Sequence, residues 1–578
     1  MHGLIFGTKS HMDEQQIFHS KGFRTLVDIP ARTFGAYKIA THLRDIGWDI
    51  EVIDFFYSFS FEEICSLLHD RITEETKFIG FSIFYKQHDQ GDNDPRGIQF
   101  YTGEDGKLNQ ILRYIHINFP WVTTVCGAQK LKSLMKIKCH YHIIGFGENA
   151  IVELTNHLIG KGPHPETTTV KNLYDVPSSS YDIELNVIDS TRHYPAFPKR
   201  SAKITYEERD YIQPNETLNI EFSRGCKFKC AFCSYNPLGV KGDMTRCNDD
   251  VYEELMENYE KWGCTHYIVS DETFNDTSEK LDKFAEVCKR LPFQPTFHGF
   301  VRMDLMASRG ERDWDNMLEM GFVGHHYGVE TLNHEAGKAI RKGMHPDKIK
   351  DYLVKTREYF VKNSPVGYYS GVITMIAGLP HESHESLKES QRWLFQNWPD
   401  KYFFIPLVLT VPEKLDKNRF DPNSDFDNLS LQHGYEFQVY NDRDTDWAGI
   451  KRGMSDEDKY HRGMIKWIHP SKEYDYVDML KWVSTINFDR VHKISMWSLP
   501  MFTQTNKNLS DTFMKGVDWD MTDTNVILDF VHKYKELKLG RSSHKRIPVH
   551  KTPIKNNEMM KKLGQQANKH MSKNLNVS

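Results

Sequence analysis

The stretch Arg224-Gly225-Cys226-Lys227-Phe228-Lys229-Cys230-Ala231-Phe232-Cys233 decides how the rest of the chain is interpreted. It places three cysteines at C-x3-C-x2-C spacing, directly after the alternating residues 218–222. Thiolates are soft ligands that suit iron–sulfur clusters and zinc. A four-iron cluster usually takes four cysteines, so three would leave one iron open to chelate a small molecule. The alternatives are a zinc knuckle, with Cys247 or a histidine as fourth ligand, and three buried cysteines without a metal.

Length and composition narrow the class of protein. The chain has 578 residues and a formal net charge of −5, enough for two or three domains and without an overall nucleic-acid-like charge. No apolar run approaches the ~18 residues of a membrane helix, and residues 1–7 do not resemble a signal peptide. Nine cysteines without a disulfide-framework spacing indicate a reducing compartment, so we expect a cytoplasmic protein.

Residues 1–160 alternate between helical and strand patterns, which predicts a doubly wound, Rossmann-like parallel sheet. Such sheets bind ligands at the carboxyl ends of their strands. The predicted helices are 36–46, 61–72, 108–117 and 149–159, and the predicted strands are 48–55, 78–84, 121–126 and 142–144. Residues 161–216 are rich in proline and serine with little periodicity, so we expect an irregular linker there.

Residues 217–412 contain six β/α units, which predicts a partial (β/α)6 barrel. The predicted strands are 217–222, 266–270, 296–301, 325–329, 367–375 and 402–411, with helices at 251–262, 278–289, 314–320, 346–362 and 383–398. Chemistry in such barrels gathers at the carboxyl ends of the strands. The cysteine loop follows the first strand, and further candidate residues end the next four strands: Asp271 and Glu272, then Arg302, Glu330 and Gly378.

The order and spacing of these strand-end residues resemble the radical S-adenosylmethionine (SAM) superfamily, as does Phe232 before the last cysteine. The resemblance implies a [4Fe-4S] cluster on Cys226, Cys230 and Cys233 that cleaves SAM reductively to a 5′-deoxyadenosyl radical. It implies further that Asp271 and Glu272 hold the amino group of SAM, that Arg302 and Glu330 lie near its ribose and carboxylate, and that Ile376 to Gly378 lie near its adenine. Ser270-Asp271 replaces the glycine pair that usually precedes the glutamate.

The amino-terminal domain resembles the cobalamin-binding domain that precedes many radical SAM enzymes, through residues 34–54 and 145–148. The family's cobalamin-ligating pattern is D-x-H-x-x-G, and here His19 and Gly22 fit while Ile17 replaces the aspartate. A metal-bound histidine needs a partner that fixes its tautomer, and an isoleucine side chain cannot supply one. We therefore expect either cobalamin bound without a protein histidine or a scaffold without cobalamin.

The function implied by the resemblance is an enzyme that modifies a substrate which the sequence does not name. Methyl transfer is the commonest outcome for this domain order, and methylthiolation, rearrangement and oxidation are others. Reduction of the cluster implies a flavodoxin- or ferredoxin-like electron donor. The alternative from another class is a zinc-stabilised nucleic-acid-binding protein.

The carboxyl-terminal residues carry weaker signals. Residues 413–540 are predicted to be mostly helical, with helices at 474–486 and 525–537 that pack on the barrel. The alternative is that some of the aromatic residues in this region line the substrate pocket. Residues 541–578 contain nine Lys or Arg and one Glu, a net charge of +8, with few apolar side chains. Such a segment is typical of a solvated, flexible tail, and contact with nucleic acid is its alternative role.

Overall fold

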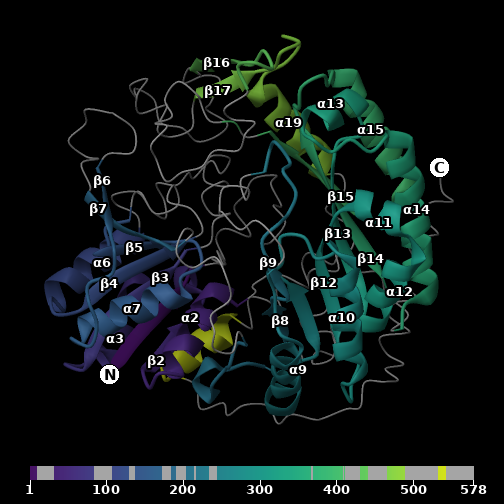
Figure 1. Cartoon of the computed structure of the whole chain (residues 1–578). Helices are drawn as coiled ribbons and strands as arrows, with labels where there is room; N and C mark the ends of the chain where they lie inside the picture. The colour runs from purple at the N-terminus through teal and green to yellow at the C-terminus, as the bar shows by residue number, and fades with distance from the viewer. Residues whose placement is uncertain are drawn as a thin grey trace.

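The computed structural model describes residues 1–8, 32–83, 107–128, 137–171, 184–190, 203–213, 216–233, 244–365, 369–407, 409, 430–439, 465–488 and 531–541. These residues form two large sheets, one in the predicted Rossmann-like domain and one in the predicted partial barrel (Figure 1). None of the helices in these ranges combines the length and apolarity that crossing a membrane requires.

The amino-terminal sheet has the strand order β2-β1-β3-β4-β5-β7-β6. Its strands are β1 (His2–Gly7), β2 (Asp49–Ile53), β3 (Thr76–Ser82), β4 (Thr123–Ala128), β5 (Tyr141–Ile144), β6 (Thr168–Lys171) and β7 (Glu184–Asp189). Its helices are α2 (Phe34–Arg44), α3 (Phe61–Arg71), α6 (Lys107–Asn118) and α7 (Glu148–Leu158). All pairs are parallel except β6 with β7. The Rossmann-like prediction is confirmed, and the two apolar faces of the sheet lie in separate core clusters.

Two parts of this sheet differ from the sequence-based expectation. Strand β1 was not predicted, although His2–Gly7 is paired on both sides, with β2 and β3, and buried from Gly3 onward. Strands β6 and β7 lie within the segment 161–216, which was expected to be irregular. Short strands between proline- and serine-rich stretches have too few residues to show an alternating pattern, so their pairing is decided by the existing edge at β5.

The second sheet has the order β15-β14-β13-β12-β11-β8 with every pair parallel, which confirms the partial barrel. Its strands are β8 (Thr217–Ile220), β11 (His266–Val269), β12 (Thr296–Val301), β13 (Phe322–Glu330), β14 (Ser370–Ala377) and β15 (Lys401–Pro406). The helices between them are α9 (Asn248–Glu257), α10 (Ser278–Lys289), α11 (Met303–Arg309), α12 (Glu311–Met320), α13 (His334–Ala339), α14 (Pro346–Asn363) and α15 (His384–Asn397). A short antiparallel pair, β9 (Ser223–Arg224) with β10 (Met244–Thr245), follows β8.

The described part of residues 413–540 is less helical than expected. It contains an antiparallel pair, β16 (Glu436–Val439) with β17 (Ile465–Ile468), and the helix α19 (Tyr476–Phe488). A second helix, residues 531–538, lies beside α2 and β2 of the amino-terminal domain rather than on the barrel (Figure 1). Its Tyr534 hydroxyl accepts from the Asp54 N–H at 2.9 Å, and its Lys538 ammonium contacts Glu51 at 2.8 Å. The tail 542–578 lies outside the described residues.

Candidate active site

The three cysteines of the opening stretch lie in one loop at the carboxyl end of β8. Gly225 adopts φ +89°, and its N–H donates to Glu272 Oε2 at 3.0 Å. Cys226 Sγ lies 3.4 Å from Thr273 Oγ1, and the Ala231 N–H donates to the Ile340 carbonyl at 3.1 Å. The loop is therefore fixed by the end of β11 on one side and by the segment after α13 on the other.

Arg302, at the end of β12, faces this cysteine loop. Its Nη1 lies 3.0 Å from Cys230 Sγ, and its guanidinium carbon lies 3.9 Å from the centre of the Phe228 ring. Asp304 accepts from Nε and Nη2 at 3.0 and 2.6 Å and orients the side chain. Arg302 is thus held against the cysteine loop, whereas its predicted contact with SAM stays a prediction.

The two acidic residues after β11 have different surroundings. Asp271 is buried and accepts from the Phe222 N–H at 2.8 Å and from the Ser223 hydroxyl at 2.6 Å. Burial raises its pKa to about 6. Glu272 is directed at the cysteine loop through Gly225, and burial raises its pKa to about 7. Both Asp271 oxygens are therefore occupied by hydrogen bonds to the residues that follow β8. Glu272 is the better candidate for contact with a ligand at the cysteine loop.

Glu330 and Phe232 are brought together by a residue that sequence reasoning left out of the site. Lys342 Nζ lies 2.9 Å from Glu330 Oε1, 2.5 Å from the Gly328 carbonyl and 5.8 Å from the centre of the Phe232 ring. Glu330 itself has φ +71°, a strained conformation for a residue with a side chain. The pair Lys342-Gly343, which begins twelve residues after Glu330, was the available signal in the sequence for this contact.

Gly378 ends β14 in a tightly held turn. Its φ is +98°, and its N–H and that of Leu379 donate to Glu382 Oε2 at 3.1 and 3.0 Å. Burial raises the pKa of Glu382 to about 8. Tyr435 donates to the Gly378 carbonyl at 2.6 Å, and a Cβ on Gly378 would lie 2.5 Å from the Trp467 ring. The carboxyl-terminal residues therefore close over the turn that the resemblance assigns to adenine.

Ile376 marks the sheet face that is turned away from the helices. The opposite face is fully buried, as where Tyr327 packs 5.9 Å from Trp398. On the Ile376 face, four paired strands carry half-buried side chains in adjacent register: Phe300, His326, Thr374 and Phe403. The Phe300 and His326 rings stack at 4.4 Å, and His326 hydrogen-bonds with Thr374. This aromatic and polar layer lies two to four residues before the strand-end residues Arg302, Glu330 and Gly378.

The donor set fits a cluster better than a single metal ion. Within the described ranges, no three Cys, His, Asp or Glu side chains converge as ligands of one ion. Zinc needs its sulfur ligands about 2.3 Å from one point, whereas a cluster distributes its cysteines over separate irons. The antiparallel pairing of β10 with β9 carries Cys247 back along β8, away from Cys226. The zinc alternative therefore loses the fourth cysteine proposed for it.

Fold and site together define a class: an α/β protein with a three-cysteine loop at the carboxyl end of a partial parallel barrel. Residues 220–394 match the family model described as the Radical SAM superfamily. These residues therefore form a radical SAM domain. The cofactors are accordingly a [4Fe-4S] cluster and SAM, and the cluster, when bound, would supply the electron for reductive cleavage of SAM. The ligand roles of individual residues, including the three cysteines, stay predictions that the geometry accommodates.

Solved structures share the fold across both domains. Two are structures of the radical SAM methyltransferase TsrM from Kitasatospora setae, one with tryptophan substrate and a SAM analogue, the other with cobalamin and a [4Fe-4S] cluster. Each has a TM-score of 0.55 and 13% identity, and covers 93% of this chain and 99% of that chain. The cobalamin-dependent enzyme OxsB has a TM-score of 0.48 and 12% identity, with 100% and 80% of the two chains covered. A comparison with curated proteins found no match.

Proposed function

We propose that this protein is a cobalamin-binding radical SAM methyltransferase. The observation that carries the proposal is the fold shared with TsrM, which extends over 99% of that enzyme and includes its amino-terminal domain. TsrM is a methyltransferase and was solved with cobalamin bound. The alternative within the same superfamily is a radical SAM enzyme whose amino-terminal domain is a scaffold only.

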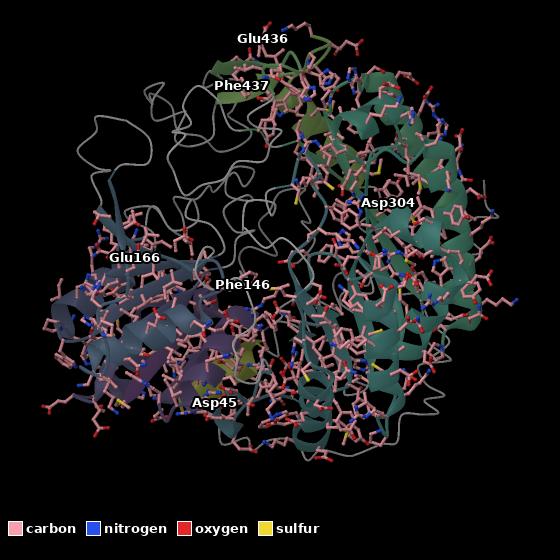
Figure 2. All side chains as sticks on the ribbon, viewed as in Figure 1. Asp45, Phe146, Glu166, Asp304, Glu436 and Phe437 are labelled. Carbon is pink, nitrogen blue, oxygen red and sulfur yellow. The ribbon has the colours of Figure 1, made fainter. Side chains whose placement is uncertain are left out.

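The carboxyl edge of the amino-terminal sheet supports a large flat ligand. Among the described residues, the nearest atom to a Cβ added to Gly127, at the end of β4, is the Ile143 carbonyl oxygen at 3.8 Å, and Gly145 after β5 adopts φ +87°. Glycines at such positions let a ligand approach the backbone. Phe146, in the turn between β5 and α7, lies on the side of the domain that faces the barrel (Figure 2). As far as the described residues go, this edge leaves the backbone open to a flat ligand such as a corrin ring.

If cobalamin binds, we expect that no histidine of the protein ligates the lower face of its cobalt. His19, Ile17 and Gly22 lie outside the described residues, so the prediction that no protein histidine ligates cobalt stays as made. In the Co(II) form, spin resonance should show the same spectrum for wild type and His19→Ala. Nitrogen hyperfine splitting that is lost in His19→Ala would contradict it.

Substrate, electron donor and location complete the proposal. The layer of Phe300, His326, Thr374 and Phe403 supports a substrate with an aromatic or other flat surface, because rings at half-exposed positions favour stacking. A flavodoxin- or ferredoxin-like protein would supply electrons. None of the nine cysteines forms a disulfide, which is consistent with a cytoplasmic location. The basic tail 541–578 is proposed to be a solvated segment, with nucleic-acid contact as the alternative.

The test is anaerobic reconstitution with iron, sulfide and hydroxocobalamin, followed by gel filtration and absorbance measurement. We expect one cobalamin per chain, and S-adenosylhomocysteine among the products of reduced enzyme with SAM. Gly127→Leu, which fills the room at the β4 edge, should lower cobalamin retention while iron content stays at the wild-type value. Wild-type protein that assembles its cluster and releases 5′-deoxyadenosine, yet retains no cobalamin, would leave the scaffold alternative standing.

A further inference from the structure

Four buried charged side chains join the amino-terminal domain to the cysteine loop. Lys38 comes from α2 and Glu148 begins α7, while Glu221 follows β8 and Arg224 lies in β9. Their side chains are 6%, 5%, 8% and 1% exposed, respectively. Two positive and two negative charges make the cluster neutral, which is the condition under which ionised groups are tolerated in a protein interior.

Arg224 is the centre of this cluster. Its Nε lies 3.0 Å from Glu221 Oε1 and its Nη2 lies 3.2 Å from Glu221 Oε2, a two-point contact within the barrel. The same Nη2 hydrogen-bonds with Glu148 of the amino-terminal domain. Lys38 hydrogen-bonds with Glu221 and lies 3.6 Å from Glu148 Oε1. Each cation thus contacts a carboxylate from both domains.

A fifth residue extends the contact to the carboxyl edge of the amino-terminal sheet. The Arg224 guanidinium carbon lies 4.3 Å from the centre of the Phe146 ring, in the turn between β5 and α7. Figure 2 places Phe146 between the amino-terminal domain and the barrel. A ligand that packs against Phe146 on this edge would therefore be separated from Arg224 only by the Phe146 ring.

The chain between Arg224 and the first cysteine is short and held at both ends. Arg224 precedes Cys226 by two residues, and the intervening Gly225 is fixed by its positive φ and its hydrogen bond to Glu272. Arg224 is also paired in register with Met244 through β9 and β10. A displacement of the guanidinium must consequently move the start of the cysteine loop.

Stability alone is a weak explanation for this arrangement. Replacing a buried ion cluster with apolar residues of similar volume is often neutral or stabilising, so charge is not needed to fill the space. What paired charges add is direction, because a guanidinium binds a carboxylate in a fixed planar geometry. The four charged side chains therefore fix the angle between the two domains at Arg224, which leads into the cysteine loop.

We propose that Arg224 is a positioning residue that couples the carboxyl edge of the amino-terminal sheet to the cysteine loop. Arg224 thereby sets the orientation in which the [4Fe-4S] cluster binds SAM. Coupling is reciprocal, so a ligand on the Phe146 edge would change the affinity for SAM, and SAM would change the affinity for that ligand by the same factor. This second statement rests on the proposed cobalamin site, whereas the positioning role does not.

The experiment compares Glu148→Gln and Arg224→Lys with wild type in reconstituted, cobalamin-free protein. Iron content, the spin-resonance spectrum of the reduced cluster with and without SAM, and the Kd for SAM by equilibrium dialysis are measured. We expect near-normal iron, an altered spectral response to SAM, and a Kd raised about tenfold, since each change removes one of the directional contacts. Glu148 is the more informative position because it belongs to the other domain.

The matched control is Arg357→Lys. Arg357 makes the same two-point contact with a buried carboxylate, Asp400, at 2.9 and 3.1 Å, but within the barrel at α14 and β15. It should bind SAM with the wild-type Kd. An equal loss in this control would assign the effect to general destabilisation and overturn the proposal, as would a wild-type Kd and spectrum in Glu148→Gln.

Two further variants keep the test decisive if Glu148→Gln does not fold. Phe146→Leu leaves all four charges and removes the ring, and Glu148→Asp keeps the charge and shortens the reach. Both should raise the Kd for SAM by about threefold, and wild-type binding in both would refute the positioning role. Failure to retain hydroxocobalamin would refute the proposed function without affecting these measurements, because the protein used for them contains none.

Discussion

Gly378→Ala is expected to disturb both the turn after β14 and the carboxyl-terminal residues that cover it. Gly378 has φ +98°, a conformation that alanine adopts only under strain. The added methyl carbon would also lie 2.5 Å from the Trp467 ring, well inside van der Waals contact. Trp467 cannot simply move away, because its Nε1 donates to the Leu407 carbonyl at 2.7 Å.

The magnitude follows from two additive costs. A non-glycine residue in a sparsely populated conformation costs about 1–3 kcal/mol. Forcing an extra carbon into a packed core costs about 1–3 kcal/mol more. The free energy of local opening at residues 372–382 and 465–470 should therefore fall by about 2–6 kcal/mol, and affinity for SAM should fall with it.

Hydrogen–deuterium exchange of peptides from these two segments measures the change, with dialysis for SAM binding. Gly47→Ala is the control for strain alone, since Gly47 has φ +87° and nothing within 4 Å of an added Cβ. Gly378→Ala with Trp467→Leu should recover the packing part of the loss. If Gly378→Ala and Gly47→Ala reduce protection equally, each in its own segment, then Trp467 does not press on Gly378 and the reasoning fails.

Three further outcomes are expected. Single alanine substitutions at the three loop cysteines should each abolish iron binding while Cys247→Ala retains it; iron loss in Cys247→Ala would favour a four-cysteine site. A chain that ends at Gly540, and so lacks residues 541–578, should still cleave SAM, because the removed residues follow every described strand-end residue; a normal cluster without 5′-deoxyadenosine would count against this. Glu382→Gln should gain stability relative to wild type as pH rises. The folded pKa of Glu382 is about 8 against 4.5 for an ordinary glutamate, so wild type loses up to ~1.4 kcal/mol per pH unit between these values while glutamine does not titrate. Thermal unfolding at pH 6 and pH 8 measures the difference, and a constant offset would show that Glu382 is ionised throughout.

The barrel was predictable because its strands are buried, β-rich runs separated by long helical patterns. All six strands were expected, with ends correct to within five residues. The largest errors at the start of a strand were three residues: β13 begins at Phe322 rather than 325, and β14 begins at Ser370 rather than 367. At β13, Gly321 and Gly324 interrupt the strand pattern. Strand β7 was missed because its pairing with β5 is a tertiary contact. A short stretch between serine and proline residues has no local pattern that predicts such a contact.

The sequence predicted which residues end the strands of the candidate site, but not the direction in which each side chain points. Neighbouring residues in an extended segment point in opposite directions, so Asp271 and Glu272 could not both face one ligand, and the structure turns Asp271 into the barrel wall. The partners of Gly378 were not predictable. Tyr435 and Trp467 reach it from 57 and 89 residues further along the chain, and neither shows a local pattern that names its target.

The helix at 531–538 has a consequence for synthesis on the ribosome. The amino-terminal sheet is made first, yet Asp54 and Glu51 meet Tyr534 and Lys538 only after about 480 further residues have been translated. At 5–20 residues per second, this delay is roughly 25 to 100 seconds. Throughout that interval the nascent domain exposes the surface that the last helix will cover, including the apolar ring of Phe55 that packs 5.1 Å from Tyr534. The domain that forms earliest is thus the last to be completed, and its vulnerability to chaperone binding or misassembly is set by the time taken to make the barrel.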